Sequence, residues 1–266
     1  MNISACIQAR MNSQRLPGKV LMEINGKPLI QWQIERLKRS KLIDDVIIAT
    51  TSSRKDDPIE KLCKELGVNY FRGSEKDVLN RVSNTLKEFK VDIHVECFGD
   101  SPLVDPQIID EFIDFFLKNS DKIDYLSSAL KSSYPAGLET SIYKSTTLFE
   151  IDRMLKSQDP YREHVGFNIT RYSEKYRLFS LEAPIHLKRP DIYLEVDTKN
   201  DFKLIELIIN NFSKKEFNYF DTFEIINFLN KNPELIKINQ DEERRWKLLR
   251  KGNKNLIYKK DLWDLS

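Results

Sequence analysis

The first half of the chain alternates short apolar, often β-branched runs with longer segments whose apolar positions recur every three or four residues. The short runs predict strands and the longer segments predict amphipathic helices. Short strands separated by helices pair in parallel through right-handed crossovers, so the pattern predicts an α/β fold with a doubly wound, mostly parallel sheet. The expected strands are 3–8, 45–51, 69–71 and 93–97, and the expected helices are 28–40, 58–66, 77–89 and 106–119.

After about residue 123 the pattern changes to strand-like and helical segments in irregular order, which indicates a mixed extension of the sheet. We expect one main domain over 1–212, with an irregular arm within about 130–190, and a helical appendage over 213–266. The expected strands of this half are 124–128, 139–143, 177–182 and 192–196, and the expected helices are 145–156, 163–171, 202–211 and 222–230.

Composition narrows the class of protein. Lys plus Arg (43) and Asp plus Glu (41) nearly cancel, which argues against a dedicated nucleic-acid binder. No apolar run approaches the roughly 18 residues of a membrane helix, and the N-terminus lacks the pattern of a signal peptide. A cytoplasmic protein is therefore expected. Cys6 and Cys97 have no metal-ligand or redox spacing and are predicted to be small buried strand residues.

The segment QARMNSQRLPGKVLMEINGKPLI (8–30) follows the first strand, where ligands of parallel sheets bind. It carries Arg10, Arg15 and Lys19 beside Gly18. Inward-facing N–H groups and cations suit a polyphosphate. It is not a Walker loop, because GxxxxGK[ST] is absent. The alternative is a solvated basic loop.

Two aspartates follow later strands. Asp100, in CFGDSPLVDP, could bind Mg²⁺ together with nucleotide phosphates, or could merely form a turn or cap a helix. Asp197, in YLEVDTKNDF, could supply a second magnesium carboxylate or cap the following helix. Thr198 is the better cap, because Asp201 follows it by three residues in a capping-box pattern.

The three motifs ARMNSQRLPGK, GDSPL and VDTKND, in this order, resemble the SpsF-like cytidylyltransferase family, which is related to the CMP-KDO and CMP-N-acylneuraminate synthetases. The resemblance also covers IDDVIIATT, FRGSEKDVLNR and REHV, and so extends to about residue 200. It implies a Rossmann-like, GT-A-like nucleotidyltransferase that moves CMP from CTP to a small acidic acceptor, with Mg²⁺ as cofactor. A homodimer formed through the 130–190 arm, and a role in surface polysaccharide or glycoconjugate synthesis, are also implied.

Carried over by residue, the resemblance assigns Arg10 and Lys19 to the triphosphate and Asp100 and Asp197 to the metal, and these four are the expected catalytic residues. Ser74 has a second interpretation, as the N-cap of the helix at 77–89. Glu139 and His164 are candidate acceptor contacts, although His164 could instead anchor the arm. The expected CTP-binding residues are Ala9, Arg10, Asn12, Ser13, Arg15, Lys19, Arg72, Ser74 and Asp77.

Two segments depart from the family pattern near the expected acceptor site. The chain reads YPAGLETSIY where PxGLDVEVF is frequent, and REHVG, with Gly166, where REHVT is common. An unusual acceptor is therefore expected. Two other functions compete with this interpretation: a nucleotide-sugar-dependent glycosyltransferase, which needs no pyrophosphate-release loop such as RLPGK, and a non-catalytic nucleotide-binding scaffold, which would not need Lys19 with both aspartates.

Overall fold

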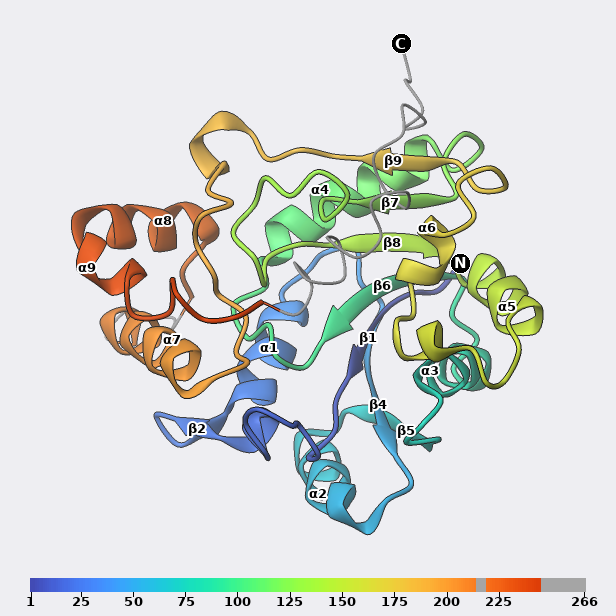
Figure 1. The fold of residues 1–266 in the computed structure, drawn as a ribbon, viewed down its shortest axis with the longest axis horizontal. Coiled ribbons are helices and arrows are strands. Elements are labelled where there is room, and N and C mark those ends of the chain that lie inside the picture. The colour runs from blue at the N-terminus through green and yellow to red at the C-terminus, as the bar shows by residue number, and fades with distance from the viewer. Residues whose placement is uncertain (214–218, 245–266) are drawn as a thin grey trace.

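The computed structural model describes residues 1–213 and 219–244, so residues 214–218 and 245–266 of the expected appendage lie outside the described residues. A seven-stranded mixed sheet runs through the molecule in the order β5-β4-β1-β6-β8-β7-β9 (Figure 1). β1 lies between β4 and β6 and is parallel to both, whereas β8 is antiparallel to β6 and β7. The strands are β1 (Ile3–Gln8), β4 (Asp45–Thr51), β5 (Asn69–Gly73), β6 (Ile93–Phe98), β7 (Tyr125–Ser127), β8 (Ser141–Lys144) and β9 (Leu178–Ser180), and β2 (Glu23–Ile24) pairs with β3 (Lys27–Pro28) in a separate hairpin.

Helices cover both faces of the sheet. Successive residues of each strand point to opposite faces, so Ala5 belongs to one apolar cluster and Cys6 to the other. The first cluster contains residues of α1 (Leu29–Leu37), α2 (Asp57–Leu66) and α4 (Pro106–Lys118), and the second contains residues of α3 (Val78–Glu88), α5 (Ser145–Met154) and α6 (Phe167–Thr170). This three-layer arrangement confirms the predicted α/β fold with its mixed extension.

A third apolar cluster joins the helices after residue 198 to the loop after β1, here called the first loop. It also includes residues of α1 that the first cluster does not contain. Here α7 (Lys199–Phe212) and α8 (Thr222–Lys231) pack around Leu16 and Trp32, and α9 (Pro233–Ile236) follows. The rings of Phe212 and Phe220 stack with their centroids 4.5 Å apart. Residues on both sides of position 212 thus share one core, and the domain division there stays a prediction. In the described part of the chain, every helix is too short or too polar to cross a membrane.

Two predicted elements are wrong. Residues 192–196 form no sheet strand, because their pairing is an isolated bridge between Tyr193 and Ala136. Gly137 allows this close approach, since a Cβ there would lie 2.6 Å from the nitrogen of Glu195. The predicted helix at 163–171 is divided: the 3₁₀ helix η3 (Pro160–Glu163) ends at Glu163, the backbone of His164 is extended, and α6 begins at Phe167.

Candidate active site

The candidate site lies where the chain reverses its order across the sheet. From β1 the chain proceeds to β4 and β5, then returns to β6 on the other side of β1. The loops after β1 and β6 therefore begin at adjacent strand ends and lead away from each other. Open α/β sheets bind ligands at such a point. Gly99 holds these loops close, because its nitrogen donates to the Gln8 carbonyl at 2.9 Å and a Cβ there would lie 3.1 Å from that oxygen.

A backbone hydrogen bond within the first loop, which follows β1, holds the loop closed just before Lys19. Gly18 has a φ of 73°, a left-handed conformation that favours glycine, and its nitrogen donates to the Met11 carbonyl at 2.9 Å. The Met11 nitrogen donates in turn to the Asp56 carboxylate at 2.7 Å, which ties the loop to the start of α2. The 3₁₀ helix η1 (Lys19–Leu21) begins directly after Gly18, so Lys19 points inward and is only 8% exposed.

Lys19 lies between the two aspartates predicted from the sequence. Its Nζ is 2.8 Å from Asp100 Oδ2, 2.8 Å from Asp197 Oδ1 and 2.7 Å from the Val196 carbonyl oxygen. Arg15 donates to the other carboxylate oxygen of Asp197. The structure thus brings together four of the predicted site residues, here called the Lys19 cluster: Arg15, Lys19, Asp100 and Asp197.

The charges of this cluster stabilise one another. Burial would lower the pKa of the Lys19 ammonium, but Asp100 and Asp197 outweigh that effect and raise it. Burial would raise the pKa of the Asp197 carboxyl, but Lys19, Arg15 and Arg244 together hold it below its usual value. Lys19 and Asp197 are therefore both ionised at neutral pH.

The start of α7 leaves Asp197 available to the cluster. Thr198 is the N-cap of α7 and forms a capping box with Asp201, which confirms the predicted cap. The Asp197 carboxylate is not used for capping and faces Lys19. The Val196 nitrogen donates to the Asp100 carbonyl at 2.8 Å, so the two aspartate loops are joined through their backbones.

The residues present fit a magnesium ion bound with a nucleotide. Asp100 Oδ2 and Asp197 Oδ1 are each 2.8 Å from one nitrogen, so they are at most twice that distance apart. Mg²⁺ is usually held by one or two carboxylates together with substrate phosphates. Within residues 1–213 and 219–244, no group of three acidic, His or Cys side chains is placed to hold a metal on its own.

Other predicted residues lie where the first loop, the loop between β5 and α3, and η3 contact one another. Arg10 Nη2 is 2.8 Å from Glu163 Oε1, which connects the first loop to η3. Asn12 Nδ2 donates to the Glu75 carboxylate, in the loop between β5 and α3, at 3.2 Å. The Asp77 carboxylate caps α3 and accepts from Arg162 Nε at 2.8 Å. Asp77, not Ser74, is thus the N-cap of α3, and the Ser74 hydroxyl accepts from the Asp77 nitrogen at 3.0 Å.

The remaining predicted residues have local partners in this structure. Arg72 donates to the carbonyls of Thr51 and Ser53 and pairs with Glu60, so it ties β5 to α2. His164 lies beside Tyr161, and burial lowers its pKa. The other three are placed as follows: Glu139 accepts from the Ser132 hydroxyl, the Ala9 nitrogen donates to the Ala49 carbonyl, and the Ser13 nitrogen donates to the Met11 carbonyl.

Glu96 is a buried carboxyl on β6 that no sequence motif revealed. Burial raises the pKa of Glu96 to about 7, despite hydrogen bonds from the Gly166 nitrogen at 3.0 Å and the Gln8 amide at 3.2 Å. A Cβ on Gly166 would lie 2.1 Å from Glu96 Oε2. Glycine in REHVG, one of the two departures from the family pattern, therefore makes room for this carboxyl.

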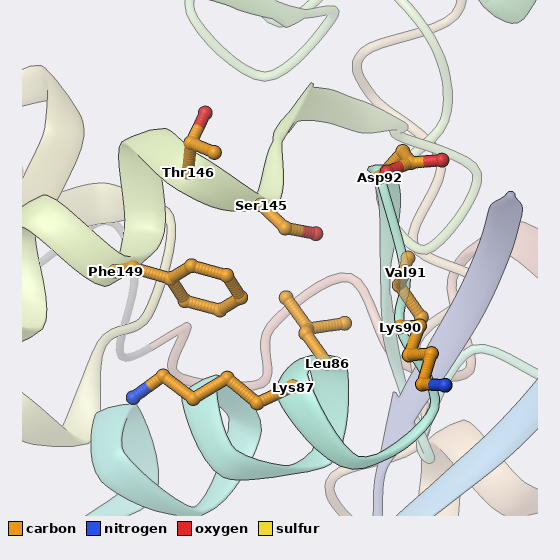
Figure 2. Close-up of a pocket in the computed structure, with 8 residues that line it drawn as sticks. All are labelled: Leu86, Lys87, Lys90, Val91, Asp92, Ser145, Thr146 and Phe149. Carbon is orange, nitrogen blue, oxygen red and sulfur yellow. The ribbon is translucent and has the colours of Figure 1, made fainter. Parts of the chain in front are cut away.

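A pocket of about 320 Å³ lies at the start of β6, at the opposite end of the strands from the Lys19 cluster (Figure 2). Asp92, which precedes β6, lines it together with Ser145 at the start of α5 and Lys87 near the end of α3. Asp100 follows the other end of β6. The pocket is therefore separate from the Lys19 cluster.

Comparison with known proteins identifies the family. Residues 4–226 match the family described as cytidylyltransferase. The chain belongs to the cytidylyltransferase family. It is 32% identical to the spore coat polysaccharide biosynthesis protein SpsF of Bacillus subtilis, over 86% of this chain and 94% of that protein. A solved cytidylyltransferase structure from Leptospira borgpetersenii is 31% identical and superposes with a TM-score of 0.83, covering 92% of this chain and 99% of the other.

A more distant relationship agrees with this assignment. The 3-deoxy-manno-octulosonate cytidylyltransferase of Bdellovibrio bacteriovorus is 34% identical over 132 residues, which is 48% of this chain and 51% of that enzyme. The family resemblance inferred from the motifs of this cytidylyltransferase-family chain is thus confirmed.

Proposed function

We propose that this chain transfers CMP from CTP to a small acidic acceptor and releases pyrophosphate, with Mg²⁺ as cofactor. The observation that carries the proposal is the Lys19 ammonium held between Asp100 and Asp197 at the strand-order reversal. Such a site combines carboxylates for a metal with cations for phosphates. The acceptor would be a sugar acid or a phosphorylated or phosphonate compound used in surface polysaccharide or glycoconjugate synthesis, a role supported by the name of the SpsF relative.

Electrostatic repulsion is the main obstacle to this reaction. An acceptor anion that approaches a triphosphate experiences about 4 kcal/mol of repulsion per unit charge pair at 4 Å, even at an effective dielectric constant of about 20. Arg10, Arg15 and Lys19, all on the first loop, would offset this charge and stabilise the departing pyrophosphate. Mg²⁺, held by Asp100 and Asp197, would act as a Lewis acid toward the charge that develops on the α-phosphate.

Lys19 must change partners before it can contact a phosphate. An ammonium has three hydrogen-bond donors, and here Asp100, Asp197 and the Val196 carbonyl accept all three. In this structure Lys19 thus neutralises the carboxylates that the metal would use. Release of at least one of these contacts would free it for the triphosphate.

The proposed nucleotide is tested by binding calorimetry in the presence of Mg²⁺. We expect CTP to bind more tightly than ATP or GTP, because the family is defined by cytidylyl transfer. ATP binding as tight as that of CTP would contradict the cytidylyl assignment but not nucleotidyl transfer as the reaction class. Inorganic triphosphate in place of the nucleotide is the control, since it reports the phosphate contacts without a base.

A further inference from the structure

The segment 239–244, which follows α9, packs against the loop that carries Asp197. Arg244 is buried, and its Nη2 lies 2.8 Å from Asp201 Oδ1. The amide of Asn239 donates to the same oxygen at 2.8 Å. Asp201 is itself fully buried, so this ion pair is shielded from solvent. The segment 239–244 is therefore fixed to the first turn of α7.

The second oxygen of Asp201 holds the residues beside it at the start of α7. Asp201 Oδ2 accepts from the Asp197 nitrogen at 3.0 Å, from the Thr198 nitrogen at 2.8 Å and from the Thr198 hydroxyl at 3.0 Å. One carboxylate thus joins Arg244 on one oxygen to the backbone of Asp197 on the other. Asp201 therefore links Arg244 to the backbone of Asp197.

Arg244 also contacts the residues that precede Asp197. Its guanidinium carbon lies 4.5 Å from the centre of the Tyr193 ring, and Nη1 is 3.6 Å from Glu195 Oε1. The Asn239 amide donates to the Tyr193 carbonyl at 3.0 Å. Asp197 is therefore fixed from both sides in sequence, by contacts at positions 193–195 and at position 201.

The same segment reaches the Lys19 cluster directly. Arg15 Nη1 donates to the Glu243 carbonyl oxygen at 2.7 Å, while Nη2 of the same side chain contacts Asp197. The hydrogen bond to the Glu243 carbonyl holds the Arg15 guanidinium in one orientation. Arg15 thus has one partner in the segment 239–244 and one in the Lys19 cluster.

We propose that the segment 239–244 positions residues of the active site. In this segment Arg244 is a positioning residue that fixes the Asp197 carboxylate through Asp201. The Glu243 carbonyl fixes Arg15 in the same way. The inference rests on the proposed function, in which Asp197 serves the magnesium–nucleotide complex. Loss of a side chain that orients a metal ligand typically costs about 10–100-fold in metal affinity or activity.

The test is the magnesium effect on CTP binding, defined as the ratio of the CTP dissociation constants measured by calorimetry without and with Mg²⁺. We expect the full-length Arg244→Met variant to show a magnesium effect about 10-fold smaller than that of the wild type. Arg36→Met is the matched control, because Arg36 is equally buried but donates to the carbonyls of Val104 and Phe220. This control should lose stability and keep the magnesium effect.

Asp197→Asn separates the two levels of the proposal. A reduced magnesium effect in both Asp197→Asn and Arg244→Met, with a normal one in Arg36→Met, supports positioning by Arg244. A normal effect in Arg244→Met together with a reduced effect in Asp197→Asn overturns the inference and leaves the proposed function intact. A normal effect in Asp197→Asn overturns the metal role of Asp197, and with it the positioning of that role by Arg244.

A conservative variant covers the case in which the methionine variant fails to fold. Arg244→Lys keeps a cation beside Asp201 but lacks the planar group that donates to Asp201 and the Asn239 carbonyl while it stacks on Tyr193. Its magnesium effect should lie between those of the wild type and Asp197→Asn. A value equal to that of the wild type would overturn the inference.

Discussion

Replacement of Asp100 or Asp197 by asparagine is expected to lower turnover by about 10²–10³-fold, the scale of losing one preorganised electrostatic contact at a reacting centre. Asparagine keeps the size of the side chain but removes the negative charge that would hold Mg²⁺. Both carboxylates contact one ammonium, so they belong to a single site. The double variant should therefore lose less than the product of the two single effects.

The measurement is steady-state pyrophosphate release at saturating Mg²⁺ and CTP, in the presence of an acceptor that supports turnover. Melting curves are the folding control, because each carboxylate also pairs with the buried Lys19. Asp114→Asn is the matched substitution, since Asp114 is an exposed partner of Lys118 on α4 and should keep full turnover. Near-normal turnover in Asp197→Asn would contradict a two-carboxylate site.

Gly166→Ala is expected to lower the free energy of unfolding by about 1–3 kcal/mol, as overpacking of a buried site does. The backbone at Gly166 has a φ of −67°, which alanine adopts readily. The cost arises instead from Glu96, since Oε2 would lie 2.1 Å from the new Cβ and the carboxyl is buried. Its displacement would also break the hydrogen bond from the Gly166 nitrogen.

A double-mutant cycle isolates this cause. In a Glu96→Ala background the clash with the carboxyl is absent and the nearest remaining atom, Tyr143 Cε1, lies 3.1 Å from the new Cβ, so the same Gly166→Ala change should cost much less. Denaturant unfolding of the four proteins gives the coupling free energy. Equal costs in both backgrounds would show that the glycine is required for another reason.

The sequence predicted best what depends on neighbouring residues. The strands at 3–8 and 45–51 have the predicted bounds, because central strands covered on both faces appear as continuous apolar runs. The cap of α7 was predictable because a capping box has a fixed spacing of three residues. The break at His164 was not, since the helical pattern continues on both sides of it.

The candidate site was predictable only as far as sheet topology determines it. Strand order brings the loops after β1 and β6 together, and so Lys19 and Asp100. The contact between Arg244 and Asp201 spans 43 residues and has no periodicity or motif that would reveal it. Glu96 was missed for a related reason, because its role depends on the absence of a side chain on Gly166, 70 residues away.

The most direct test of the proposed reaction follows the α-phosphate of CTP. The protein is incubated with Mg²⁺, CTP labelled at the α-phosphorus, and a panel of sugar acids, phosphorylated sugars and phosphonates. The proposed reaction predicts that one acceptor class triggers pyrophosphate release with the label transferred to the acceptor, and that Asp197→Asn lowers both signals by about 10²–10³-fold. Release of a nucleoside diphosphate from a nucleotide sugar, with no acceptor-dependent pyrophosphate from CTP, would contradict it.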